Sequence, residues 1–195
     1  MSSTSPPFSP GSISIRLYAH DELTPPDIIA ELCRQARLAT DQGFDGVMTS
    51  EHHGGLSGYL PNPLQLASFI LEDTDGGWAA PCPLVLPLRP AAMVAEEIAW
   101  LDARHPGRVG LGVAAGALPL DFAAMGMEIG EAVPRFKAEL PSVARLLRGE
   151  ELQGLARDRA LAGLAGRPIP VLSAASSPEA CRRAARCGWG FCSMG

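Results

Sequence analysis

The sequence predicts an α/β fold with a parallel sheet, and three observations lead to this prediction. Apolar stretches of strand length alternate with helical stretches at intervals of roughly 25–40 residues, which is typical of repeated βαβ units. The polar residues Ser50-Glu51-His52-His53 directly follow the apolar run 44–49. A glycine-rich loop comes next, and a helix start at Asn62-Pro63 follows it. α/β barrels carry their chemistry at such carboxyl ends of buried strands, so we expect the chain to descend from an enzyme.

Six strands are expected, each from a short apolar run with strand character. They cover 13–18, 44–49, 78–88, 108–113, 169–174 and 189–193. The third run contains Pro81, Pro83 and Pro87. Because proline removes a donor from the strand ladder, we expect a distorted strand there.

Helices are expected between these strands, and several have clear boundaries. The segment Thr24-Pro25-Pro26-Asp27 combines a hydroxyl N-cap, proline in the first turn and an acid at the third position, and Gly43 is a natural end. Ser177-Pro178 opens the last helix, which Gly188 closes. The remaining helices are expected from 62 onward and over 90–103, 118–125 and 133–147, and 149–166 is expected to be a loop with some helix.

Composition excludes several classes of protein. The chain has 195 residues, of which 47% are hydrophobic and 19% charged, as in one compact domain. The net charge of −5 offers no basic surface to nucleic acid and no polybasic membrane anchor. No apolar stretch approaches the about 20 residues of a membrane span. Residues 1–12 are expected to form a flexible tail, not a signal peptide, and residues 13–195 the domain.

Neither a disulfide framework nor a metal site is expected. The five cysteines are odd in number and include no C-x-x-C pair, which favours reduced thiols in a cytoplasmic protein. Glu51, His52 and His53 are adjacent, so their side chains diverge, and no histidine pair at i,i+4 accompanies them.

A set of short motifs matches a known family in order and spacing. The motifs are Glu51-His52-His53, Asn62-Pro63, Leu86-Pro87-Leu88-Arg89, Ala95-Glu96-Glu97, Leu101-Asp102, the stretch 107–113 and Asp121-Phe122 with Gly126. Each is weak alone, but the ordered set resembles the bacterial luciferase-like flavin-dependent monooxygenases, from about Ile13 to Gly195. The resemblance implies a TIM-type (β/α)8 barrel that binds reduced FMN, or in some branches F420, at the carboxyl ends of its strands.

Two catalytic residues follow from this resemblance. His52 matches the first histidine of the family's E-H-H motif, which lies beside the flavin and acts in the oxygen chemistry. Histidine suits this role because it exchanges protons near neutral pH. We predict His52 and Glu51 as catalytic residues and His53 as their structural neighbour, since successive strand residues point opposite ways. Without the resemblance, a loop or capping histidine is the alternative.

Six residues are predicted to bind the cofactor: Cys82, Pro83, Ala115, Gly116, Ser176 and Ser177. In the family a cis peptide lies where the flavin ring packs, and the matching bond is Cys82–Pro83, for which we predict cis over the alternative of a trans proline in a bent strand. The small residues at 115 and 116 let a cofactor approach the backbone, although the luciferase branch carries a phosphate-binding arginine at position 115. Positions 176 and 177 match phosphate contacts at a helix amino end, and simple N-capping by Ser177 is the alternative.

The strand signals number six, whereas a (β/α)8 barrel of about 250 residues has eight. We therefore expect an incomplete barrel of about six β/α units, with unpaired edges on its first and sixth strands. A fragment, an oligomer that covers the gap and a shrunken barrel without turnover all remain open. Family members pair through their early helices, so the resemblance also implies a homodimer.

The resemblance implies an oxidoreductase or monooxygenase that oxidises a small organic molecule with reduced FMN or F420 and O₂. The alternative is a truncated, non-catalytic flavin-binding or interaction protein on the incomplete barrel. We expect little monooxygenase activity from the isolated chain. The substrate and the choice between FMN and F420 cannot be read from these residues.

Overall fold

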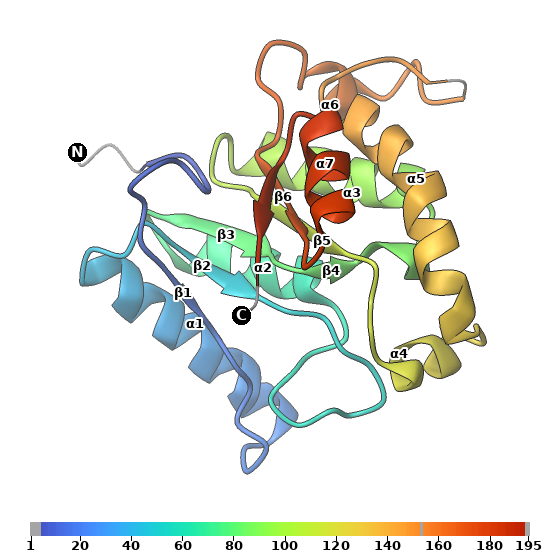
Figure 1. The fold of residues 1–195 in the computed structure, drawn as a ribbon. Helices are drawn as coiled ribbons and strands as arrows, with labels where there is room; N and C mark the ends of the chain where they lie inside the picture. The colour runs from blue at the N-terminus through green and yellow to red at the C-terminus, as the bar shows by residue number, and fades with distance from the viewer. Residues whose placement is uncertain (1–4, 153, 194–195) are drawn as a thin grey trace.

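A computed structural model gives the fold and describes residues 5–152 and 154–193. Its strands pair in parallel and form a curved surface with helices packed around it (Figure 1). One sheet has the order β1-β2-β3 and the other β4-β5-β6-β7, and an isolated bridge between Ala79 and Val109 joins them. The strands are β1 (Ser14–Arg16), β2 (Gly46–Thr49), β3 (Trp78–Pro81), β4 (Leu84–Val85), β5 (Leu111–Ala114), β6 (Val171–Ala174) and β7 (Gly190–Cys192).

The predicted third strand is interrupted, as expected from its prolines. β3 pairs with β2 whereas β4 pairs with β5, and Cys82 and Pro83 lie between them. The Cys82–Pro83 peptide is cis, which confirms that prediction. The short 3-10 helix η1 (Leu86–Leu88) then leads into the next helix.

The predicted helices are present with small shifts at their ends. Asn62 Oδ1 accepts the Gln65 N–H at 3.1 Å, and Ser177 Oγ accepts the Ala180 N–H at 3.2 Å, so both predicted starts are capped. The first helix ends two residues before Gly43, whose φ of +94° turns the chain out of the helix. The helices are α1 (Pro25–Asp41), α2 (Pro63–Asp73), α3 (Ala91–Arg104), α4 (Pro119–Ala124), α5 (Ala132–Leu146), α6 (Arg159–Ala162) and α7 (Pro178–Arg186).

The strands are shorter than predicted, and the fourth illustrates the reason. We expected it over 108–113, but the ladder with β6 begins only at Leu111. Val109 makes an isolated bridge to Ala79 instead. The predicted run therefore includes backbone that crosses from one sheet to the other before regular pairing begins.

The main hydrophobic core lies between the sheet and the helices. Val47, Ile98 and Leu111 are each at most 1% exposed within it. This burial uses the outward-facing residues of the strands. The inward-facing residues are left to line the interior of the curved sheet, because successive strand residues point to opposite faces.

A smaller cluster fills this interior. It consists of Trp78, Ala80 and Cys82, with Phe8, Met48, Leu172 and Cys192 packed against them. Phe8 meets the Trp78 ring edge-on at a centroid distance of 5.1 Å. Phe8 belongs to the segment 1–12 that is predicted to be a flexible tail. Residues 1–4 lie outside the described range, but Phe8 packs inside the curved sheet. The domain boundary at residue 13 stays a prediction.

The outer strands have the free edges expected of an incomplete barrel. Within residues 5–152 and 154–193, β1 pairs with β2 alone and β7 with β6 alone. Ile13 and Phe191, at these edges, are 64% and 57% exposed. None of the helices described combines the length and apolarity needed to cross a membrane.

The interior tolerates little added volume, and Gly46 tests this. A Cβ at this position would lie 2.1 Å from the Trp78 ring. We expect Gly46→Ala to lower the free energy of unfolding by about 1–3 kcal/mol, measured by urea denaturation, because overpacking forces neighbouring groups apart. Gly130→Ala is the matched control, since a Cβ there meets nothing within 4 Å. Equal stability of the two variants would contradict the packing described.

Candidate active site

A pocket of about 380 Å³ lies at the carboxyl ends of the strands. Segments far apart in the sequence meet there because parallel strands end at the same rim. The loop after β2 and the helix α4 lie on this side of the molecule (Figure 1). The pocket is lined by Ser50, Glu51, His52, Pro83, Val85, Ala114, Ala115, Gly116, Ala117, Ala174, Ala175, Ser176 and Cys192.

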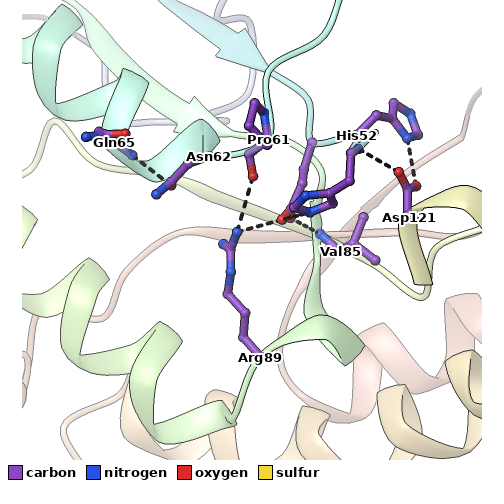
Figure 2. A network of polar contacts seen from close by, with 9 residues as sticks. His52, Pro61, Asn62, Gln65, Val85, Arg89 and Asp121 are labelled. Atoms are coloured by element: carbon purple, nitrogen blue, oxygen red, sulfur yellow. Dashed lines mark hydrogen bonds and ion pairs between the residues drawn. The ribbon is translucent and has the colours of Figure 1, made fainter. Parts of the chain in front are cut away.

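His52 reaches this pocket on the loop after β2 and is held there by Asp121. Its Nδ1 lies 2.9 Å from Asp121 Oδ2, and the backbone N–H of His53 donates to Asp121 Oδ1 at 2.7 Å. Figure 2 shows the His52 ring and the Asp121 carboxylate facing each other. A carboxylate can only accept, so Nδ1 carries the proton and donates it. The other ring nitrogen, Nε2, has no hydrogen-bond partner among the described residues and is left for proton exchange.

Glu51 lies at the base of the pocket and is 1% exposed, and both of its carboxylate oxygens have hydrogen-bond partners. Arg89 donates to Oε1 at 2.6 Å, the ring of His53 contacts the same oxygen at 2.9 Å, and the N–H of Val85 donates to Oε2 at 2.6 Å. Arg89 also reaches the Pro61 carbonyl at 3.5 Å (Figure 2). Burial raises the pKa of Glu51, while Arg89, then the Val85 N–H and His53, counteract it.

An aromatic side chain covers the other side of His52. The Tyr59 ring stands perpendicular to the imidazole at a centroid distance of 4.5 Å. Tyr18 meets Tyr59 edge-on in turn, at 5.6 Å. His52 thus has a carboxylate at one nitrogen and a perpendicular aromatic ring beside it, and 24% of its side chain stays exposed.

The structure brings most of the predicted site residues to one place. Glu51, His52, Pro83, Ala115, Gly116 and Ser176 line the pocket. Cys82 lies below it and is 1% exposed. Ser177 is not part of the lining and caps α7, which is the alternative stated for it; its contact with phosphate stays a prediction.

Sequence reasoning missed Asp121, Arg89 and Tyr59. Asp121 belongs to the quoted motifs and follows the carboxyl end of a strand, so the rule that singled out His52 would have found it. Arg89 also belongs to a quoted motif and follows β4, so the same rule would have found it. Tyr59 is not part of a quoted motif, and its role depends on a contact with His52 made in the folded chain. Among residues 5–152 and 154–193, no group of three or more His, Cys, Asp or Glu side chains is arranged to hold a metal ion.

Comparison with solved structures identifies the architecture. The fold matches the FMN-bound oxygenating constituent of 3,6-diketocamphane monooxygenase from Pseudomonas putida with a TM-score of 0.78 and 20% identity, over 94% of this chain and 57% of that one. At this identity the likeness shows the fold alone. It confirms the predicted α/β fold, in which the described strands form part of a TIM-type barrel.

The family model for luciferase-like monooxygenases matches residues 12–195. The chain belongs to this family. It is 31% identical, over 190 residues, to the F420-dependent glucose-6-phosphate dehydrogenase of Beutenbergia cavernae, covering 90% of this chain and 54% of the dehydrogenase. It is 27% identical over 112 residues to the alkanal monooxygenase alpha chain of Photorhabdus laumondii, covering 57% of this chain and 31% of that protein. The chain thus spans about half the length of the dehydrogenase.

The buried carboxylate of Glu51 leads to a prediction on stability. We expect Glu51→Ala to lower the free energy of unfolding by about 3–5 kcal/mol, because it leaves the Arg89 guanidinium, whose side chain is only 15% exposed, without its partner. Urea denaturation measures this. Glu72→Ala is the matched control: its side chain is 53% exposed and pairs with Arg104 at 2.8 Å, so a loss of about 1 kcal/mol or less is expected. Losses of the same small size in both variants would contradict a structural role for Glu51.

Proposed function

We propose that the pocket beside His52 binds FMN or F420 and that the protein oxidises a small organic molecule there. The observation that carries this proposal is the convergence of His52, Pro83, Ala115, Gly116 and Ser176 on one pocket. Membership of the luciferase-like family supports it. We further propose a homodimer in the cytoplasm.

The lining of the pocket fits the flat ring of a flavin or deazaflavin. Residues 114–117 are alanine or glycine, so backbone and methyl groups form one wall. Gly116 has a φ of +82°, and a Cβ there would lie 2.8 Å from Phe122 and Val85. A larger residue at 116 would therefore collide with the protein's own side chains, and the alanines at 114, 115 and 117 would present nothing larger than methyl groups to a planar cofactor. When bound, reduced FMN would supply electrons to dioxygen, whereas oxidised F420 would accept a hydride from the organic molecule.

The phosphate of such a cofactor fits the amino end of α7. Ser176 is exposed and lines the pocket, and α7 begins two residues later, after the N-cap Ser177. The helix dipole favours an anion at this position, where Pro178 has no N–H and the Ala180 N–H is donated to Ser177 Oγ. Because residue 115 is alanine and not arginine, this helix end would carry the contact that the luciferase branch makes with a side chain.

His52 is proposed to hold and move a proton. Its Nδ1 is committed to Asp121 at 2.9 Å, which fixes the ring orientation and leaves Nε2 for exchange. Asp121 acts as a positioning residue. The predicted catalytic role of Glu51 stays a prediction; its contacts with Arg89, His53 and Val85 favour a positioning role for it as well.

The test has a binding step and a turnover step. The purified chain is titrated with FMN and, separately, with F420, followed by absorbance. Oxidation of reduced FMN by O₂, or reduction of F420 by a panel of small alcohols, is then measured for the chain and for His52→Ala. We expect His52→Ala to keep its affinity and to slow turnover by about 10² or more, the usual contribution of one acid–base residue.

The control is His20→Ala, which changes an exposed histidine outside the pocket. It should alter neither the affinity for the cofactor nor the turnover. Binding without turnover in the unaltered chain would overturn the catalytic part and favour the non-catalytic flavin-binding alternative. Binding of neither cofactor would overturn the whole proposal.

A further inference from the structure

Two cysteine side chains pack together inside the curved sheet, below the pocket. Cys82 directly follows β3 and is 1% exposed. Cys192 is the last residue of β7 and also lines the pocket. Both belong to the interior cluster around Trp78, so the end of β3, in the middle of the described strands, and the edge strand β7 bring two thiols together.

The surroundings of this pair are built to hold it. A Cβ at Gly112 would lie 2.3 Å from Cys82 Sγ, so only glycine on β5 leaves space for the sulfur. Ser50 Oγ donates to the Cys82 carbonyl at 3.3 Å, and Arg16 donates to Ser50 Oγ. The guanidinium of Arg16 is close enough to lower the pKa of both thiols.

The two thiols differ in their chemistry. The proximity of the two sulfurs is the largest cause that lowers the pKa of Cys192, to about 6, and that raises the pKa of Cys82. Arg16 lowers the pKa of Cys192 further, against the opposing effect of burial. The lowered pKa favours the thiolate form of Cys192, which reacts as a nucleophile, and the raised pKa favours the thiol form of Cys82 beside it.

We propose that Cys82 and Cys192 form a redox-active pair that hydrogen peroxide converts to a disulfide across the floor of the pocket. The Cys192 thiolate attacks one peroxide oxygen, the O–O bond breaks, and the other oxygen leaves as water after protonation. The resulting sulfenic acid is attacked by the Cys82 sulfur, which loses its proton, and a second water leaves. Two thiols are oxidised, one peroxide is reduced, and no flavin takes part.

The disulfide would connect the end of β3 to β7. Cys192 would then no longer present a free sulfur to the pocket, and β7, an edge strand of the described sheet, would be fixed covalently. The same reaction would make occupancy of the pocket sensitive to peroxide. This proposal stands independently of the proposed function, because it needs only the two thiols and the oxidant.

The experiment treats the reduced 195-residue chain with hydrogen peroxide and follows thiol loss and intact mass. We expect the chain to lose two thiols and a mass of two hydrogen atoms, and a tryptic digest without reduction to contain the peptide pair linked through Cys82 and Cys192. Cys192→Ser should slow thiol loss about tenfold or more, because it removes the thiolate. Cys82→Ser should instead stop at an oxidised Cys192 that carries added oxygen.

Cys181→Ser and Cys187→Ser are the matched controls, because both residues are half-buried cysteines on or next to α7. Each should still form the Cys82–Cys192 link. Cys82→Ala and Cys192→Ala, checked for folding by circular dichroism, repeat the test should a serine variant be unstable. Thiol loss at the same rate without Cys192, oxidation of Cys192 without a link to Cys82, or a link through Cys181 or Cys187 would each overturn the proposal.

Discussion

The buried carboxylate of Glu51 is the contact on which the rest of the site depends. It accepts donors from three parts of the chain: the next-but-one residue His53, the backbone of β4 at Val85 and the side chain of Arg89 after η1. Removing a carboxylate from water is costly, and these three partners offset part of that cost, since burial still raises the pKa of Glu51. The loop after β2 is therefore fixed against the interrupted third strand, and His52 projects from this fixed loop.

Asp121 completes the arrangement from the opposite side. One oxygen holds the ring of His52 and the other holds the backbone of His53, so a single side chain on α4 sets both the position and the orientation of the imidazole. The two carboxylates have different positions: Glu51 anchors the loop at the base of the pocket, and Asp121 orients the His52 ring at the rim. Small residues on the neighbouring strands then leave open the space that His52 faces.

Much of the fold follows from local features of the sequence. The helix starts at Asn62 and Ser177 are predictable because each side chain caps its own helix, and the break near Pro83 is predictable because proline cannot donate to a ladder. His52 is predictable because it follows the carboxyl end of a strand. The motif resemblance adds the barrel, which local periodicity alone does not specify beyond a parallel sheet.

What the sequence does not predict are the contacts between distant residues. His52 and Asp121 are 69 positions apart, and Glu51 and Arg89 are 38 apart. Neither pair has a spacing that points to an interaction, since both arise only when the strands align at one rim. The packing of Phe8 against Trp78 was missed for the same reason. A serine- and proline-rich segment predicts a flexible tail, and its contact with the interior of the sheet arises only in the folded chain.

The most direct test of the account is hydrogen–deuterium exchange of the chain with and without FMN or F420, resolved by peptide. If the cofactor occupies the pocket at the carboxyl ends of the strands, protection should appear in peptides that cover 50–62, 83–89, 114–122 and 174–180. Peptides from α1 should remain unchanged. Protection confined to other surfaces, or the same exchange with and without either cofactor, would contradict the claim that these residues form the cofactor site.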